Sequence, residues 1–504
     1  MRKTLALTFL CLATLGAKAQ ISRLGEDLEY SASAQMSAGS GDYAPFWFTS
    51  NRYGLGPLES KSGLFRASIS RSTSADSLRS WRFGYGADFV GAINHDSKAI
   101  VQQLYADFRF KAIQLSIGQK ERPLELKNQQ LSSGGMTTGI NARPIPQVRL
   151  ELPDFWTIPR TGKWLAIKGH IAYGMFTDNH WQETHSGANG RYAKNVLYHS
   201  KAGFLRIGNR EKFPVTLTGG FDTGDQFGGE AWNVIRRDDD ESSFDNTHVK
   251  LSHSLKSFWN AFIMGGVGVA DGDYKNTEGN QLGSWHLRAD YDGKLFGASF
   301  YAEHYFDDHS QLFLQYAWKD MLYGGEVRLP RNHFVSTLLY EHLRTTDQSG
   351  SIYHDATPTL PYQLSEEDNY YNHGTYTGWH HAGYAMGNPL LLSPVYNNGE
   401  EIFFRNNRVL ASHFGLSGEP TSYISYRILF THEKSLGSYS KPLLNPAYGN
   451  YLLIEATYAP TQVQGLTVTL DYGQNGGTLL GRGKGFMLTA SYTGWINHKR
   501  KEQR

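Results

Sequence analysis

The most regular feature of this chain is an alternation of apolar and polar residues with a period of two. Between Trp81 and Ile93, every odd position except Gly91 is apolar or aromatic. The even positions of the same stretch include Arg82 and Asp88. A period of two is that of a β-strand with one face in an apolar medium and the other against polar groups. We therefore predict a strand whose outer face contacts lipid.

The same alternation recurs along the chain in segments of about ten residues, separated by Gly, Asn, Asp and Ser, which is typical of a transmembrane β-barrel. Roughly twenty segments qualify as strands on this pattern. Beside 28–36, 81–93 and 424–430, strands are predicted at 101–110, 112–118, 164–175, 247–255, 295–306, 334–343, 452–458, 466–472 and 485–496. Helical periodicity is scarce, and its best candidate is the short stretch 121–131.

A secreted β-sandwich or propeller would also alternate. The length of the alternating segments and the absence of blade-sized repeats argue against both. No Pro- or Ser-rich linker and no break in composition divides the chain. We predict one all-β, antiparallel outer-membrane barrel over residues 20–497, which includes a long loop at 345–401. We interpret the basic residues 498–504 as a disordered periplasmic tail.

The first nineteen residues have the pattern of a signal peptide. Arg2 and Lys3 precede an apolar stretch, and small residues stand at Ala17 and Ala19, so cleavage is expected before Gln20. The only cysteine lies within this segment, which leaves the mature chain without disulfides or thiolate ligands. Cleavage also removes three basic residues and changes the formal charge from +2 to −1. Nothing in this balance indicates a nucleic-acid partner.

Three blocks of residues stand out from the strand pattern. They are PFW at 45–47 with NRYG at 51–54, then LSSGG at 131–135 with NARPIPQ at 141–147 and PDF at 153–155, and finally NHGTY at 372–376 with GNPL at 387–390 and SPVYN at 393–397. In this order, and across most of the mature chain, they resemble the capsule assembly family named Wzi, in its Bacteroidetes form.

The resemblance implies an outer-membrane barrel of about 18 strands that acts as a lectin and holds capsular polysaccharide at the cell surface. It implies no catalysis. Enterobacterial members also carry a helical bundle, whereas this chain enters a strand at Leu28 and shows little helix. We therefore expect surface polysaccharide, outer-membrane lipid and the barrel-insertion machinery as partners, no cofactor, and a monomer in the outer membrane of a Gram-negative cell.

The NARPIPQ block suggests a rigid turn. Pro144 and Pro146 lack backbone donors, so the block is not expected to form a central strand. Asn141 and Arg143 are candidates for donating hydrogen bonds to a uronic acid or another sugar in the lumen. The alternative is that both satisfy backbone carbonyls within a tightly packed turn.

The segment 345–401 is the longest break in the strand pattern, and it is rich in Tyr and His. Loops of this length are uncommon unless they have a function. Its candidates for sugar contact are Tyr376, Trp379, His380 and Tyr384, because flat rings suit the apolar faces of sugars. The alternative is a plug in which these rings pack into the barrel mouth. Adjacent His380 and His381 point apart in an extended chain, so no metal site is predicted.

Charged residues of both signs occupy the polar face of the predicted strands. They are Asp88, Asp107, Arg109, Glu303, Arg427, Glu433, Glu455 and Asp471. Mixed signs suggest pairing across a plugged lumen, although a substrate-selective porin would share them. An outer-membrane hydrolase or acyltransferase is disfavoured because no G-x-S-x-G motif is present and no paired carboxylates can be placed together by alternation.

Overall fold

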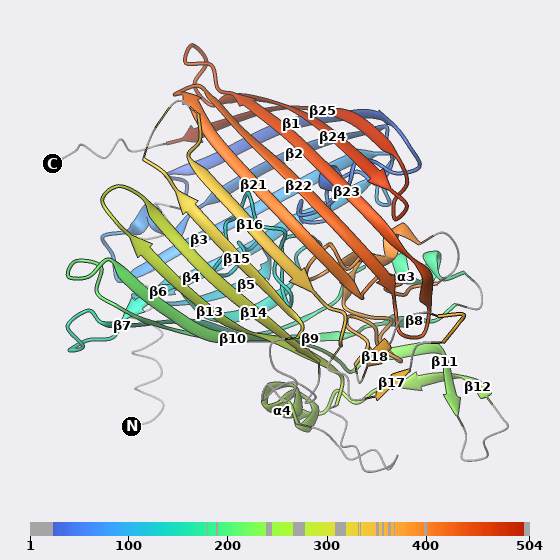
Figure 1. Ribbon diagram of the computed structural model, residues 1–504. Helices are drawn as coiled ribbons and strands as arrows, with labels where there is room; N and C mark the ends of the chain where they lie inside the picture. The colour runs from blue at the N-terminus through green and yellow to red at the C-terminus, as the bar shows by residue number, and fades with distance from the viewer. Residues whose placement is uncertain are drawn as a thin grey trace, which may run out of the picture.

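This chain folds into a closed barrel with apolar residues on its outer face and polar residues on its inner face. The computed structural model describes residues 24–497 apart from 179, 188–189, 238–243, 266–277, 308–318, 331, 333, 349–351, 355–356, 361–363, 367 and 398–400. Its main sheet has 18 antiparallel strands, and the pairing of the first strand with the last closes the ring. The predicted fold class is confirmed (Figure 1).

Each barrel strand pairs with the barrel strands before and after it along the chain. The barrel strands are β1 (Leu28–Ser40), β2 (Ser62–Arg71), β3 (Trp81–Ile93), β4 (Ala99–Phe110), β5 (Ile113–Gln119), β6 (Gln147–Thr157), β7 (Leu165–Met175), β9 (Leu197–Ile207), β10 (Val215–Phe227), β13 (Asn280–Asp292), β14 (Gly297–Asp307), β15 (Met321–Arg328), β16 (Thr337–Arg344), β21 (Val409–Thr421), β22 (Ile424–Gly437), β23 (Pro442–Tyr458), β24 (Leu466–Gly477) and β25 (Gly483–Ile496).

The remaining elements lie in the connections between barrel strands. They are α2 (Phe46–Thr49), η1 (Thr73–Asp76), α3 (Trp181–His185), β8 (Tyr192–Lys194), β11 (Glu230–Arg237), β12 (Phe244–Lys250), α4 (Leu255–Ile263), β17 (Ile352–His354), β18 (Leu364–Glu366), β19 (His380–His381), β20 (Tyr384–Ala385) and η2 (Pro394–Tyr396). No helix among the described residues is long and apolar enough to cross a membrane.

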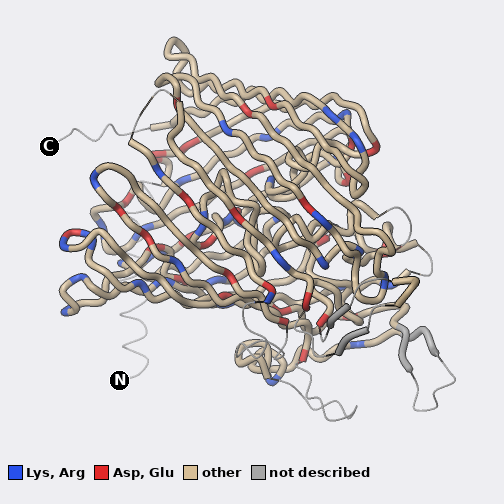
Figure 2. Tube along the Cα trace, viewed as in Figure 1, with Lys and Arg blue, Asp and Glu red and all other residues tan. Residues whose placement is uncertain are grey.

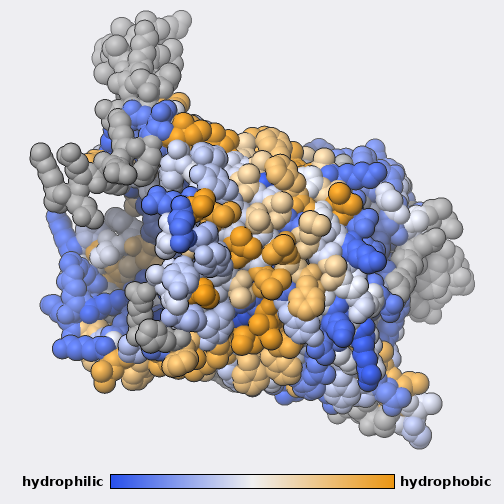
Figure 3. Space-filling model, turned by 90° about the horizontal axis from the view of Figure 1, so that it is seen from above, coloured by the Kyte–Doolittle hydropathy of each residue, from blue (hydrophilic) through white to orange (hydrophobic). Residues whose placement is uncertain are grey.

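The alternation predicted from the sequence is visible in the exposure of the side chains. On β1, Met36 is 70% exposed and Ser37 beside it is buried, and on β3, Phe89 is exposed and Asp88 is buried. Such residues form an apolar band on the outer surface between two hydrophilic rims (Figure 3). This band is what lipid requires of a barrel wall.

The connections differ in length at the two ends of the barrel. At one end, the short-turn rim, strands are joined by tight turns such as Lys111–Ala112 between β4 and β5. At the other end, the long-loop rim, lie the connections 41–61, 120–146, 228–279 and 345–408. Both described termini of the chain lie at the short-turn rim (Figure 1), because the number of strands is even.

Two predicted elements are wrong. The helix expected at 121–131 is an irregular segment. Gln129 bonds the backbone of Leu124 and Lys127 there, and Leu126 has a positive φ of 54°, which interrupts a helix. The strand expected at 247–255 ends at Lys250, and Ser254 then caps helix α4 by accepting from the Ser257 N–H at 3.2 Å.

Candidate functional site

Three segments of the long-loop rim fold into the lumen and bond to one another. We call them together the plug: residues 43–58, 120–146 and 369–397. The Tyr53 N–H donates to the Ile140 carbonyl at 2.7 Å, and the Gly139 N–H donates to the Met386 carbonyl at 2.7 Å. The plug contains nearly all of the sequence blocks that stood out in the chain, although these lie hundreds of residues apart.

The plug reaches almost opposite walls of the barrel. Phe46 donates its N–H to Asn475 on β24 at 2.8 Å. On β10, a Cβ added to Gly224 would lie 2.4 Å from the Trp379 indole, so only glycine leaves room for that ring. Strands β10 and β24 are eight places apart in the ring of 18. Phe46 and Trp379 belong to one buried apolar cluster, which fills the lumen with core.

Asn141 links all three segments of the plug. Its side-chain carbonyl accepts from the Asn51 N–H at 3.1 Å, and its amide donates to the Ala385 carbonyl at 2.9 Å. Only 1% of the residue is exposed. Its hydrogen bonds therefore serve the protein's own backbone, as the packing alternative for the NARPIPQ block requires.

The aromatic candidates of the long loop are buried as well. Trp379 is fully buried, and its indole N–H donates to the Thr137 carbonyl at 2.7 Å. Tyr376 is 3% exposed and Tyr384 is 1% exposed, with the Tyr384 hydroxyl 3.4 Å from the Gly56 carbonyl. The long loop therefore does not present Trp379 at an exposed tip. In this arrangement, the rings have no exposed face on which a sugar could stack.

His380 is held as a neutral imidazole within the plug. Its Nδ1 accepts from the Gly383 N–H at 3.3 Å, and its Nε2 lies 3.1 Å from the Thr377 hydroxyl. Burial, together with the nearby His381, lowers the pKa of His380 to about 3. The His381 Nδ1 instead contacts the Arg143 carbonyl at 2.9 Å, so the two rings have separate partners.

Two carboxylates of the barrel wall hold the middle segment of the plug. Glu303 on β14 accepts from the Met136 N–H at 2.7 Å and forms an ion pair with the Lys127 ammonium. Glu341 on β16 accepts from the Ser132 hydroxyl and the Ser133 N–H, both at 2.7 Å. Both carboxylates are 1% exposed. The sequence alone could not place Glu303 and Glu341 together, but in the structure both form hydrogen bonds to neighbouring residues of one loop.

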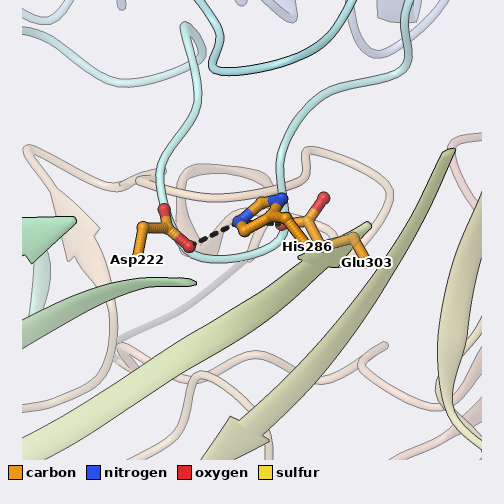
Figure 4. Close-up of side chains that lie close together, drawn as sticks. All are labelled: Asp222, His286 and Glu303. Carbon is orange, nitrogen blue, oxygen red and sulfur yellow. Dashed lines mark hydrogen bonds and ion pairs between the residues drawn. The ribbon is translucent and has the colours of Figure 1, made fainter. Parts of the chain in front are cut away.

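Glu303 also belongs to a buried group with Asp222 on β10 and His286 on β13 (Figure 4). The ligand atoms of the three residues lie within 4.8 Å of one another, as they would around a metal ion. The His286 Nε2 lies 2.8 Å from Asp222, and Asp222 also accepts from the Thr138 hydroxyl at 3.0 Å. His286, the Thr138 hydroxyl and Lys127 therefore already supply partners for the carboxylates of Asp222 and Glu303. These contacts within the protein explain why the three residues lie together.

The other charges predicted to face the lumen lie on the strand faces opposite the apolar band, and both signs are spread along the strands (Figure 2). Most have a partner of opposite sign. The pairs are Asp88 with Arg66 at 2.5 Å, Asp107 with Lys120 at 2.5 Å, Arg109 with Asp154 at 2.9 Å, Arg427 with Glu455 at 2.8 Å, and Asp471 with Arg52 at 3.4 Å. Glu433 is fully buried.

Between the plug and the wall lies a cavity of about 100 Å³, which we call the basic cavity. Of the sequence-predicted sugar contacts, only Arg143 lines it. Its other polar lining residues are Tyr53, Lys120, Arg122, Glu125, Thr138, Gln147, Arg149, His170, Tyr198, Ser200 and Asp222. Its lining also includes Pro123 and Pro144, which are not buried, so the cavity is not sealed from solvent.

Sequence reasoning missed Arg122 and Arg149 as candidates. Alternation on β6 could have placed Arg149 on the inner face with Glu151, because Val148 and Leu150 between them are exposed to lipid. Arg122 gives no such signal, because it lies in the irregular segment mistaken for a helix. The fold of the plug alone brings it to the wall.

Tyr192, Trp232 and His248 form a stack of aromatic rings on the small sheet β8–β11–β12 beyond the long-loop rim. Tyr192 and Trp232 lie 5.2 Å apart with 8° between their planes, and Trp232 and His248 lie 4.5 Å apart. Each ring of the stack covers a face of the next, so both faces of Trp232 are occupied. We interpret the stack as a set of cross-strand contacts that stabilise this sheet.

Comparison with known proteins supports the fold. The sequence matches no protein-family model and no curated protein. Among solved structures, it is similar to Wzi of Escherichia coli, described as an outer membrane protein involved in group 1 capsule assembly and a carbohydrate-binding β-barrel. The TM-score is 0.53 at 11% identity, over 94% of this chain and 86% of that one. The fold is that of an outer-membrane β-barrel.

Other solved structures align with the chain less closely. OpdK of Pseudomonas aeruginosa aligns with a TM-score of 0.46 at 10% identity, over 93% of this chain and 99% of that one. OprD of the same organism aligns with a TM-score of 0.43 at 9% identity, over 93% of this chain and 95% of that one. Likeness at this level carries no functional assignment, so the specific function stays open.

Proposed function

We propose that this protein is a non-enzymatic, Wzi-like outer-membrane lectin that binds capsular or other surface polysaccharide and holds it at the cell surface. The observation that carries the proposal is the plug, which ties three rim segments together and packs against almost opposite walls. A lumen filled in this way suits binding better than conduction. The basic cavity beside the plug supplies hydroxyl, guanidinium and aromatic groups, which are the usual partners of sugars.

Two further points support the proposal. The long-loop rim, from which the plug is built, is the end that faces outside in outer-membrane barrels. Most residues of the three blocks that resemble the Wzi family lie in the plug, and each plug segment contains some of them. The resemblance therefore concerns the segments that fill the lumen as well as the wall.

The deciding experiment compares binding and conductance in one purified sample. We expect the folded barrel to bind polysaccharide extracted from the cells that make it, and to show little conductance in planar bilayers. Dextran serves as the control polymer. Absence of polysaccharide binding together with large, stable conductance would overturn the proposal.

Deletion of the gene tests the same proposal in the cell. We expect synthesis of the polymer to continue and capsule to be released into the medium, because only its retention is lost. Disappearance of the polymer altogether would indicate export or biosynthesis instead. Total and cell-bound polysaccharide are the two quantities to measure.

A substrate-selective porin is the second candidate. The observation that favours it is a polar cavity of about 340 Å³ in the half of the barrel near the short-turn rim. Its lining includes Glu29, Ser31, Ser68, Ser491 and Thr493 on the inner faces of β1, β2 and β25. Conductance inhibited by an oligosaccharide would favour this candidate.

A further inference from the structure

Two arginines of the basic cavity have only neutral hydrogen-bond partners. Arg122 donates to the Lys120 carbonyl and to the Ser116 hydroxyl, both at 3.1 Å. Arg143 donates to the Ser97 hydroxyl at 3.3 Å. Within the described part of the chain, neither guanidinium has a carboxylate oxygen close enough to form an ion pair. Both charges are therefore left without a direct counter-ion.

Arg143 has N–H donors without acceptors as well as a charge without an ion-pair partner. Its Nε and Nη2 are buried, and no acceptor contacts them among the described residues. A buried donor without an acceptor is unfavourable, and a charged one more so. Arg143 itself lines the cavity, so a negatively charged group placed there would lie near this guanidinium and offset its charge.

The carboxylates around the cavity have partners of their own. Asp107 forms an ion pair with Lys120 at 2.5 Å, and Glu151 with Arg149 at 2.6 Å. Glu125 pairs with Lys168 at 2.7 Å. These pairs cancel in charge. The charge of Asp96 acts on Arg143, but Asp96 is not among the residues that line the cavity. On the lining itself, Arg122 and Arg143 therefore remain as cations without an ion pair.

The surroundings of Arg122 oppose its positive charge. Burial, and then the neighbouring charge of Arg149, lower the pKa of Arg122 to about 10. Arg122 is still protonated at neutral pH, but its environment favours the arrival of a negative charge. Arginine is the side chain best suited to such a group, because its planar fork pairs with two oxygens of a carboxylate or phosphate.

We infer that the basic cavity receives an anionic substituent, a carboxylate or a phosphate, of the bound polysaccharide, so that the protein recognises an acidic polymer rather than a neutral one. This inference rests on the function proposed above. About 100 Å³ is room for one such substituent with water, and not for a chain of sugars. The rest of the polymer would lie outside the cavity.

The test measures the affinity of the detergent-solubilised barrel for four polymers. They are the polysaccharide of the cells that make the protein, the same polymer with its carboxylates reduced to alcohols, the polymer with its phosphates removed, and dextran. We expect one of the two treatments to weaken binding at least tenfold, which identifies the anionic group. Added salt should weaken the binding of the untreated polymer but not of the neutralised one.

Single variants assign the effect to the cavity. Arg122→Gln and Arg143→Gln should each weaken binding of the untreated polymer about tenfold, the loss expected for one charge-assisted contact. Arg143→Lys should retain part of the affinity. The matched control is Lys163→Gln, which removes an exposed charge paired with Glu211 at the short-turn rim. Altered migration of unboiled samples on gels confirms that each variant is folded.

The outcomes separate the inference from the function on which it rests. Equal affinity for all treated polymers and for the folded arginine variants would overturn the anionic site and leave the lectin standing. No binding of any polymer by the wild-type barrel would overturn the proposed function itself. An anion-selective current that Arg122→Gln abolishes would make the cavity part of a pore for small anions, and would also overturn the inference.

Discussion

Trp379 shows how the role of one residue depends on its depth in the fold. In the sequence it is a large aromatic residue in the middle of a polar loop, a setting that favours a sugar platform. In the structure its ring fills the space beside Gly224, and its indole N–H has a backbone acceptor. Its contribution is therefore to closure and stability, through packing.

Replacement of Trp379 by alanine should lower the free energy of unfolding by about 3–5 kcal/mol, because it leaves a large cavity in the core. It should also raise the conductance of the barrel in planar bilayers, since the ring packs the plug against β10. Trp259→Ala is the matched control, because Trp259 is 59% exposed on α4. An unchanged melting temperature in a barrel that still closes would contradict this role.

His380 makes the plug sensitive to acid. Its folded pKa of about 3 lies below the ordinary value of 6.5, so the unfolded chain binds a proton that the folded chain does not. The stability from the neutral ring is complete above pH 6.5 and is lost as the pH falls toward 3. At pH 5 the loss should be about 2 kcal/mol for this residue.

Melting temperatures at pH 7 and pH 5 measure this effect. His380→Asn should show a smaller drop between the two pH values than the wild type, whatever its own stability at pH 7. His432→Asn, at an exposed position on β22, should retain the full drop. The same pH dependence in His380→Asn and the wild type would rule out a contribution from this ring.

At the scale of the element, the plug is stable because side chains of the barrel wall form hydrogen bonds and ion pairs with it. The middle segment has little regular structure of its own, and Glu303 and Glu341 bind its backbone N–H groups and Lys127. Loops of this length are otherwise uncommon in compact domains. Wall and plug should therefore lose stability together.

Lys127→Met tests this coupling. The substitution leaves Glu303 buried without its ammonium partner, and it should cost about 3–5 kcal/mol. The double variant with Glu303→Gln should recover part of this loss, since no unpaired charge remains. A double-mutant cycle on chemical unfolding gives the coupling energy. Additive losses would show that the pair does not hold the plug.

At the scale of the whole molecule, the apolar band commits the barrel to a lipid bilayer. Ile428→Arg places a charge on the outer face of β22 and should cost about 2–4 kcal/mol near the middle of the bilayer. Less protein should then reach the outer-membrane fraction. Ser425→Arg, three residues earlier and exposed near the short-turn rim, is the matched control. Equal yields of the two variants would place Ile428 outside the hydrocarbon region.

The sequence by itself determined the barrel and its two faces. Alternation is local, because neighbouring side chains of a strand point to opposite sides whatever the strand pairs with. The odd positions between Trp81 and Ile93 were therefore placed on the lipid side correctly, and the exposed and buried residues of β1, β3, β22 and β25 follow the pattern. The three blocks in the connections also marked the chain segments that form most of the plug.

Only the tertiary structure decided what those connections do. Asn141 and Trp379 acquire their roles from residues more than 50 positions away in the chain, and no local pattern encodes such contacts. Strand β12 alternates like a wall strand, but it pairs with β11 outside the barrel. Buried backbone N–H and C=O groups need hydrogen-bond partners. The residues on the inner face of the wall therefore decide which loops can fold into the lumen and which of their side chains are buried there.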